Sequence, residues 1–566
     1  MLRGTAFAHD LVSEGTLETM PQVLAGTLHE AVASWLQSHE GEPGRIAIHL
    51  QAAGQDRAAV PWLMRAAAHA SARIQLRDAA RLCEQAADIC QREGDASGEL
   101  AALEAAVDAL FDVELGPHME SLLARLQGLT LDDAERARAL RCEAAVRHFK
   151  LEDDHAEALG REALRLAMAT GQRALEFRVR YGLVQVLSHR RDLAASQAVL
   201  EPIRDWVQRE ADAVQRLQFQ CMDGWVLLAS ERFEPAIQVW QQVAQQAALL
   251  ERPRDQAMAL NHLQVCWSLM GRFDAGHEAG LHEQRIVHKH RLGGTRIIYL
   301  DLNLSISALL LGRYRESLAA LTRAESSGVP DQATLHLRRA AFNLQMGQPA
   351  RALNDLRPLL DGRVPAQVAV RFNATLLHAR WLAAHSELTA DARLAAQRQA
   401  LAQATELAAQ TKRVDHAARV ALLRGRLADA GEGVARLTEA VVMTHRHGLR
   451  GMEAAAHALL ARALMVAGDK AKVREHIETA LSLRDQGHVT DQMPGVELEA
   501  IAIELLSRLD PPRAAALLAQ AVAWVRSTAA AEVPDALQHG FLHVHPVHRA
   551  LMSRANTPPD LLRIDN

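Results

Sequence analysis

The stretch Met258–Leu360 repeats one short pattern at nearly constant spacing. Residues 271–276 read GRFDAG, residues 312–317 read GRYRES, and residues 347–352 read GQPARA. Upstream, residues 231–236 read ERFEPA, with glutamate in place of the first glycine. The first residues of these four units are separated by 40, 41 and 35 positions, which is the signature of an internal repeat.

Each position of the unit has a physical explanation. A glycine at the end of an apolar helical run can adopt the left-handed conformation that ends a helix. The aromatic residue two positions later covers the turn, and the small residue five positions later lets the next helix cross closely. Each unit is therefore predicted to be a helical hairpin. One hairpin cannot bury its apolar stripe, so successive hairpins must stack around a shared core.

The same register extends along most of the chain, which predicts about thirteen or fourteen hairpins. Hydrophobic residues make up 49% of the sequence but aromatic residues only 4%, and alanine and leucine carry most of the apolar content. These are strong helix formers, so an all-α chain follows. A period near 40 also occurs in armadillo and HEAT repeats. The turn pattern favours a superhelical solenoid of tetratricopeptide-like hairpins.

Charge and hydropathy exclude several classes of protein. The net charge of −5 creates no global basic field, which argues against direct nucleic-acid binding. The sequence has no uninterrupted apolar run of about 18 to 20 residues, and its first ten residues lack the features of a signal peptide. We therefore predict a cytoplasmic protein without membrane contact. The five scattered cysteines are predicted to be reduced core residues: Cys83, Cys90, Cys142, Cys221 and Cys266.

The N-terminal segment resembles part of a known family. The relevant residues are Phe-x-His-Asp-Leu-Val at 7–12, Leu-His at 28–29, Arg-Ile-Ala-x-His-Leu at 45–50, Ala-Gly at 53–54, Ala-Ala at 58–59, and Trp62. They are similar to the junction in bacterial STAND-type regulatory ATPases, which include large transcriptional activators, where a winged-helix segment passes into a tetratricopeptide-like sensor region. The resemblance implies that His9 and Asp10 match the pair that closes the winged helix over bound nucleotide.

The resemblance covers only the sensor side of that family. The chain contains no Gly-x-x-x-x-Gly-Lys-Ser/Thr phosphate loop, so His9 has no nucleotide to sense within it. Residues 1–27 are predicted to be a winged-helix remnant or an N-terminal cap, residues 28–530 the solenoid, and residues 531–566 a capping helix and tail. The segment from Trp524 to Leu551 resembles the closing part of the same sensor regions, where a last helix covers the open end of the stack.

Polar residues on the first helices of the central hairpins are candidates for a binding groove. Within each helix they are spaced three, four or seven positions apart, so each set lies on one helix face. First helices line the concave surface of tetratricopeptide stacks, so this set could bind a peptide or a small ligand. The alternative is an ordinary exposed polar face. The candidates are Asn261, Gln264, Ser268, Asn303, Ser307, Arg339 and Asn343.

A basic patch precedes Gly293 and comprises Arg285, His288, Lys289 and Arg291. One interpretation is an anion or acidic-partner site at the mouth of the groove. The other is that these cations complement the dipole at the C-terminal end of a helix.

No catalytic or metal motif is predicted. The histidines at 539, 543, 545 and 548 are interrupted by Pro546, so at most two rings would share a helix face. His277 and His282 differ from a zinc-protease pair by one residue, which turns the second ring by about 140° instead of aligning it. We therefore predict no cofactor, no metal and no enzymatic activity.

The sequence thus predicts a non-catalytic binding module, the sensor part of a bacterial signal-transduction or transcription-regulatory system. Its partner would be a protein, a peptide or a small-molecule effector. Such a sensor requires a ligand with different affinities for two states of the stack. The alternatives are a constitutive protein-interaction scaffold and a metal-dependent hydrolase that uses the histidine-rich C-terminal end.

Overall fold

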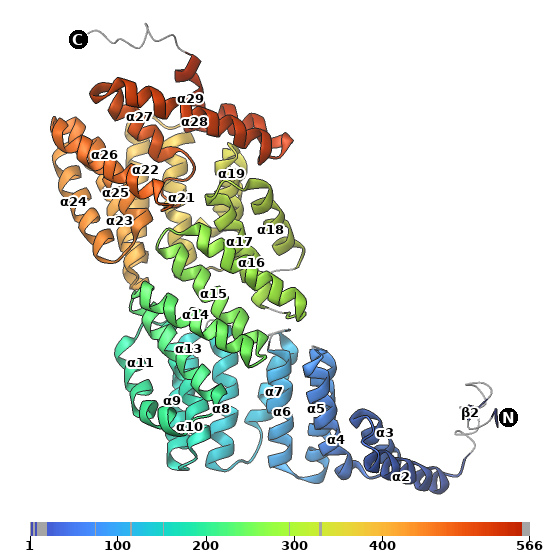
Figure 1. The fold of residues 1–566 in the computed structure, drawn as a ribbon. Helices are drawn as coiled ribbons and strands as arrows, with labels where there is room; N and C mark the ends of the chain where they lie inside the picture. Colours follow the sequence, from blue (N-terminus) through green and yellow to red (C-terminus); the bar gives the residue numbers. More distant parts are fainter. Residues whose placement is uncertain are drawn as a thin grey trace. The chain divides into compact units, whose positions relative to one another are not determined.

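The computed structural model describes residues 2–3, 6–7, 20–73, 75–111, 113, 116–150, 152–293, 295–327, 331–385 and 387–556. Regular structure within these residues is helical except for one short antiparallel pair, β1 (Leu2–Arg3) and β2 (Ala6–Phe7) (Figure 1). The all-α class is therefore confirmed. The boundaries at 27 and 530 remain predictions. Two compact units, Met1–Arg209 with His290–Gly294 and Glu210–Lys289 with Thr295–Asn566, are described here separately.

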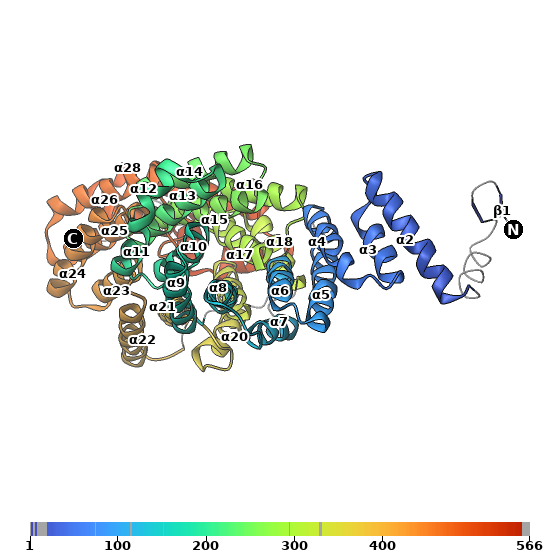
Figure 2. The ribbon, with the colours of Figure 1, turned by 90° about the horizontal axis from the view of Figure 1, so that it is seen from below.

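The first unit consists of consecutive antiparallel helices, drawn in blue and cyan in Figure 2. Its core is rich in alanine and leucine, with Leu100 and Ala106 fully buried between neighbouring helices. The helices are α2 (Gln22–Ser38), α3 (Pro43–Ala52), α4 (Asp56–Ala72), α5 (Leu76–Glu93), α6 (Ala96–Leu110), α7 (Pro117–Gln127), α8 (Asp133–Phe149), α9 (Asp153–Ala169), α10 (Arg173–His189), α11 (Leu193–Leu200), η1 (Glu201–Ile203) and α12 (Arg204–Glu210).

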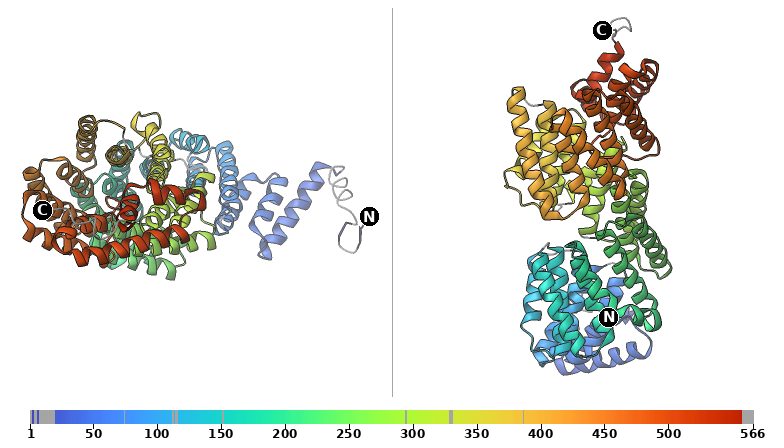
Figure 3. Two further views of the ribbon diagram at one scale, coloured as in Figure 1. Left: turned by 90° about the horizontal axis from the view of Figure 1, so that it is seen from above. Right: turned by 90° about the vertical axis from the view of Figure 1, so that its left-hand side faces the viewer.

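The second unit is a run of hairpins in which each odd-numbered helix from α13 to α27 is the first helix of a pair. Successive first helices begin 36 to 47 residues apart, which confirms the period of about 40. Figure 3 shows this stacking most clearly for the orange helices. The helices are α13 (Ala213–Ala229), α14 (Phe233–Leu249), α15 (Pro253–Leu269), α16 (Phe273–Lys289), α17 (Thr295–Leu310), α18 (Tyr314–Ser326), α19 (Gln332–Gln345), α20 (Pro349–Leu360), α21 (Val368–His385), α22 (Ala390–Thr411), α23 (Val414–Leu427), α24 (Ala430–Arg446), α25 (Arg450–Ala467), α26 (Lys470–Asp485), α27 (Glu497–Leu509), α28 (Pro511–Ala531), η2 (Asp535–Leu537), η3 (Gly540–Val544) and α29 (Pro546–Asn556).

The repeated turn has the geometry that its sequence predicts. Gly271 follows α15 with a φ of +83°, and α16 begins two residues later at Phe273. Gly276 then packs against α15, where an added Cβ would come 3.2 Å from the backbone oxygen of Gln264. Small residues are therefore needed at this position because the two helices of the hairpin cross closely.

Glu231 replaces the glycine in one turn for a reason that lies outside the turn. Its φ of +61° is unfavourable for a residue with a Cβ. The Glu231 carboxylate accepts a hydrogen bond of 2.9 Å from the backbone N–H of Val414, the first residue of α23. This bond satisfies one of the free N–H groups at a helix start and offsets the local strain.

The second unit winds back on itself, because its early hairpin tips contact segments far along the sequence. Val489 N–H donates to the carbonyl of Gly271 over 2.8 Å, and the Glu231 contact spans 183 residues. An added Cβ on Gly312 would lie 3.2 Å from the Trp524 ring of α28. These contacts confirm a superhelical arrangement within this unit.

The C-terminal helices complete a core that they share with the middle hairpins. Tyr314 at the start of α18 is fully buried, and its ring centroid lies 5.4 Å from that of Phe541. Val525 of α28 belongs to the same cluster. Among the described helices, α28 alone is long and apolar enough to span a membrane by length and composition, and its partly buried apolar face contributes to this core. All five cysteines are buried and unpaired, as predicted.

His548 in α29 makes stability of the second unit depend on pH. Its side chain is 1% exposed, its Nδ1–H donates to the Phe541 carbonyl over 2.9 Å, and burial lowers the pKa of the ring to about 4. The unfolded pKa is about 6.5, so the unfolded state binds the proton more readily between these two values. His548 therefore contributes stability above pH 6.5, and this contribution is lost as pH falls towards 4.

We expect His548 to account for about 2 kcal/mol of lost stability between pH 7 and pH 5. Urea unfolding at both pH values, followed by circular dichroism, measures it. His548→Asn should reduce the pH dependence by this amount. His545, whose ring centroid lies 4.0 Å away, should be replaced separately to distinguish the two rings. An unchanged pH dependence in His548→Asn would disprove this assignment.

Candidate binding groove

A groove runs along the first helices of the second unit. It consists of compartments with volumes of about 660, 310 and 300 Å³. Arg426 and Arg462 line the first two, and Arg380 and His545 line the second and third, so the compartments adjoin one another. The walls come from α15, α17, α19, α21, α23 and α25, joined by residues 491–494, α27 and α29.

Three of the predicted polar residues line this groove: Gln264, Ser268 and Asn303. Gln264 is only 2% exposed, and both polar atoms of its amide lack a hydrogen-bond partner within the part of the chain that the structure describes. An unsatisfied buried amide costs about 1 to 3 kcal/mol. A ligand that hydrogen-bonds Gln264 would recover part of this cost.

The other four candidates are not among the groove-lining residues. Asn261 lies one turn before Gln264 on α15. Ser307 is buried, donates to the backbone oxygens of Asn303 and Leu304, and lies 2.8 Å from His277 Nδ1. Arg339 and Asn343 bond with Glu325 and Asp355 outside the groove.

The face of α19 that meets the groove is shifted by one residue from the predicted one. Arg338 and Gln345 line the groove, together with Leu337, Ala341 and Leu344. One residue corresponds to a rotation of about 100°, so Arg339 and Asn343 point towards α20. Their spacing of four identified a common helix face, but spacing alone cannot tell which face lies inside the superhelix.

The predicted basic patch does not form one structural unit. Arg285, His288 and Lys289 are exposed on the last turns of α16, in the second unit. Arg291 is exposed with a φ of +50° and belongs to the first unit. A role in binding anions or partners therefore remains a prediction. His9 and Asp10 lie outside the described residues.

The segment 488–496 crosses the groove and is held by charged side chains. Arg419 donates to the Asp491 carboxylate over 2.7 Å, and Arg380 donates to the Asp491 carbonyl over 2.5 Å and to Glu497 over 2.6 Å. Burial alone would raise the pKa of Asp491, but the positive charges of Arg419, Arg380 and Arg338 and a hydrogen bond from Gln492 together outweigh it and hold that pKa below the usual value. We call residues 488–496 the strap.

Arginines dominate the charge of the groove. Seven arginines line it against four carboxylates, a formal charge of +3 in a chain whose net charge is −5. The carboxylates are Asp415, Asp491, Glu497 and Glu504. We call the seven the groove arginines: Arg338, Arg380, Arg413, Arg419, Arg426, Arg462 and Arg554.

The sequence contains a signal for these arginines that the search for polar helix faces missed. Arg338, Arg380, Arg419 and Arg462 follow one another at intervals of 42, 39 and 43 residues, close to the repeat period. Residues separated by one period occupy equivalent positions on successive first helices. An arginine that recurs with the period therefore forms a row along the groove, which we call the arginine ladder.

The histidine-rich C-terminal end does not form a metal cluster among the described residues. His545 lines the groove, whereas His548 is buried against Phe541. In the described part of the chain, one group of three could hold a metal: His148, Asp153 and His189 in the first unit. The Asp153 carboxylate already pairs with both rings at 2.7 and 2.8 Å, and these hydrogen bonds account for the cluster.

A comparison with known protein families finds no match, and neither does a comparison with curated proteins. Among solved structures, the chain is similar to a Rap protein complexed with competence and sporulation factor (12% identity, TM-score 0.44, 68% of this chain and 99% of that one). It is also similar to the apo form of the quorum sensor NprR from B. thuringiensis, with 13% identity and a TM-score of 0.44 over 62% of this chain and 100% of that one. A third similar structure is the APC/C hetero-tetramer Cut9-Hcn1, with 13% identity and a TM-score of 0.43 over 81% of this chain and 95% of that one. Likenesses at this level do not identify a function, so function must be argued from the groove.

Proposed function

We propose that this chain is a non-catalytic peptide-binding module whose groove in the second unit holds an extended peptide. The observation that carries the proposal is Gln264, a groove-lining residue whose buried amide lies beside Gly280 of α16 and has no hydrogen-bond partner among the described residues. A buried amide of this kind requires a hydrogen-bond partner from outside the chain, either a ligand or an ordered water. Two Gln264 polar atoms and the nearby amide of Asn303 can pair with the N–H and C=O groups of a peptide backbone.

The other lining residues also suit a peptide. Leu310, Leu337 and Leu377 provide apolar surface between polar groups, and the groove compartments have the size range of ordinary ligand pockets. Asn373 and Gln345 add further amides along the wall. An extended chain with alternating polar and apolar side chains matches a wall of this composition.

We further propose that peptide binding serves as a signal, as expected for the sensor part of a bacterial STAND-type regulatory system. The resemblance at residues 7–62 supports this setting. The strap supplies a physical means, because a peptide in the groove would compete with Asp491 for Arg419 and Arg380. Binding would then favour a state in which the strap is released.

An unbiased selection tests peptide binding. A random peptide library displayed on its encoding mRNA would be selected against the full chain, and enriched peptides would be labelled and titrated by fluorescence anisotropy. We expect the enriched peptides to bind the chain. Gln264→Leu should weaken their binding by about tenfold, which corresponds to the loss of one hydrogen-bonded amide. The control is Asn343→Leu, outside the groove. Failure to enrich any peptide would overturn the proposal.

Hydrogen exchange of the strap distinguishes a sensor from a scaffold. If the chain is a sensor, exchange at residues 488–496 should rise when a selected peptide binds, because the strap loses its contacts with Arg380 and Arg419. Unchanged exchange with peptide bound would favour a constitutive scaffold instead.

A further inference from the structure

We infer that the groove selects acidic peptides, whose carboxylates pair with the arginine ladder. This inference rests on the proposed function and names the ligand chemistry. The ladder arginines lie five to eight residues before the last residue of α19, α21, α23 and α25, and all four line the groove. Arg380 and Arg419 would become available to a ligand once it displaces Glu497 and Asp491.

The carboxylates of the groove neutralise three of the seven groove arginines, two of which belong to the ladder. Arg413 pairs with Asp415, Arg419 with Asp491, and Arg380 with Glu497. The remaining groove arginines make no hydrogen bond or ion pair with any residue that the structure describes, and Glu504 is the one groove carboxylate that remains without an ion pair among those residues. The unpaired arginines are Arg338, Arg426, Arg462 and Arg554.

Arg338 is a ladder arginine that has no ion pair among the described residues. Its side chain lines the third compartment and is partly exposed, and its Nε is buried without a hydrogen-bond partner among the described residues. Burial lowers the pKa of Arg338 to about 10, with Asp491 acting in the opposite direction. The group therefore remains charged at neutral pH, and a charge that is partly withdrawn from water without an ion pair is costly. A carboxylate from a ligand would remove that cost.

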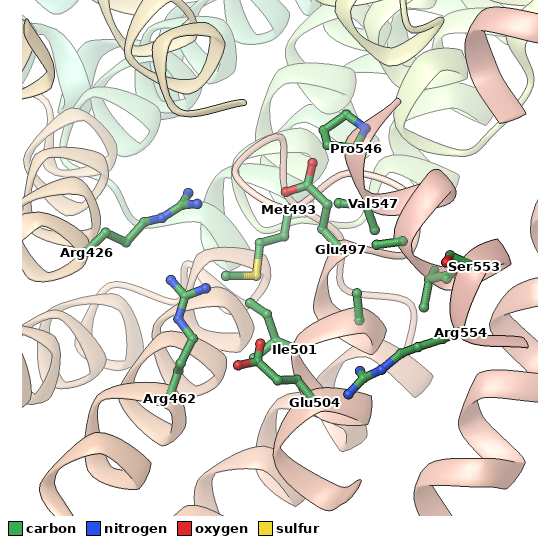
Figure 4. Close-up of a pocket in the computed structure, with 13 residues that line it drawn as sticks. Arg426, Arg462, Met493, Glu497, Ile501, Glu504, Pro546, Val547, Ser553 and Arg554 are labelled. Carbon is green, nitrogen blue, oxygen red and sulfur yellow. The ribbon is translucent and has the colours of Figure 1, made fainter. Parts of the chain in front are cut away.

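The wider compartment also holds arginines that have no ion pair among the described residues. Figure 4 shows Arg426 and Arg462 directed into the pocket from one side and Arg554 from the opposite side, with Glu497 and Glu504 between them. Arg426 is exposed to solvent inside the groove. The surrounding protein lowers its pKa to about 10, Glu497 opposes this, and Arg462 and Arg380 add to it. Positive charges that repel one another in a pocket attract an anion to it.

The spacing of the ladder specifies how acidic residues should be arranged. Packed helices lie about 8 to 10 Å apart, and an extended peptide advances about 3.4 Å per residue. One guanidinium therefore faces about every third residue of the ligand. The apolar residues between the arginines, including Leu344, Leu376 and Leu423, would contact the intervening side chains.

A nucleic acid fits the groove less well than a peptide. Single strands bind through bases stacked on aromatic side chains along a basic channel. Phe273 is the one phenylalanine, tyrosine or tryptophan among the residues that line the three compartments, within the part of the chain that the structure describes. Leucines and side-chain amides line the groove where aromatic rings would be needed to stack on nucleic-acid bases.

Anisotropy titration of blocked, labelled peptides tests the inference. Three copies of Asp-Leu-Ser place an acid at every third position, and three copies of Asn-Leu-Ser provide the uncharged isostere. We expect the acidic peptide to bind at least about tenfold more tightly, with an advantage that shrinks as salt rises. Arg338→Gln combined with Arg462→Gln should abolish most of the advantage. Arg339→Gln, next in sequence but outside the groove, should preserve it.

Thermal unfolding of the variants separates a binding role from a structural one. Removing a partly buried charge that has no ion pair among the described residues should leave the melting temperature of Arg338→Gln unchanged or raise it. A clear decrease would mean that Arg338 holds the fold together, which would overturn its assignment to a ligand.

The remaining outcomes are distinguishable. Equal affinity for the two peptides, or enrichment of non-acidic sequences from the random library, would overturn the acidic preference and leave peptide binding intact. Displacement of the acidic peptide by an oligothymidylate at similar concentration would overturn it in favour of a nucleic-acid ligand. A chain that binds neither peptide and enriches none would overturn both proposals.

Discussion

Replacing Trp240 with alanine is expected to destabilise the second unit by about 3 to 5 kcal/mol. The Trp240 side chain is fully buried in α14, and its ring stacks on His262 with centroids 4.3 Å apart. The position of Gly224 on α13 has no room for a larger residue, because an added Cβ there would come 2.7 Å from the Trp240 indole. Alanine would leave a cavity between α13, α14 and α15 that close-packed helices cannot fill.

Urea unfolding followed by circular dichroism would measure the Trp240→Ala effect. The matched control is Trp35→Ala, because Trp35 is 58% exposed on α2 and should cost less than about 1 kcal/mol. A loss below about 1 kcal/mol for Trp240→Ala would contradict the close packing of these hairpins.

The second large effect is expected from Gly347→Ala, at about 2 to 4 kcal/mol. Gly347 has a φ of +65°, which costs an alanine about 1 kcal/mol. An added Cβ would also lie less than 3.0 Å from the carbonyl oxygen of Gly540, and overpacking of this kind costs about 1 to 3 kcal/mol more. The turn after α19 and the segment before α29 would have to separate.

Gly468→Ala isolates the two contributions to the Gly347 effect. Gly468 also has a positive φ, +87°, but nothing lies within 4 Å of an added Cβ. It should therefore cost only about 1 kcal/mol. Equal losses for the two variants, measured by thermal unfolding, would show that the contact between Gly347 and Gly540 contributes nothing.

The hairpins could be predicted from the sequence because their determinants are local. A left-handed residue such as Gly271, the start of α16 at Phe273 and the close crossing at Gly276 all lie within six residues. Local sterics act on such a segment wherever the chain goes. The period of the pattern then required the hairpins to stack.

Only part of the groove could be predicted in the same way. Gln264, Ser268 and Asn303 line it as expected, whereas Arg339 and Asn343 lie one helix face away from Arg338. Both faces of α19 carry polar residues at helical spacing, so the periodicity within one helix does not decide between them. The recurrence of arginine at the repeat period is a better signal, because it compares equivalent positions between helices.

The sequence by itself determined the class of fold, the repeat length and the chemistry of each turn, because these depend on residues a few positions apart. Three contacts were determined only by the tertiary structure. The Gly271 carbonyl accepts a hydrogen bond from Val489 N–H, Gly347 packs against Gly540, and Asp491 of the strap lies beside Arg419. These contacts join residues far apart in sequence, and small rotations between successive hairpins accumulate to bring them together. No local sequence pattern contains this accumulated rotation, which brings Arg419 to Asp491 and Arg380 to Glu497.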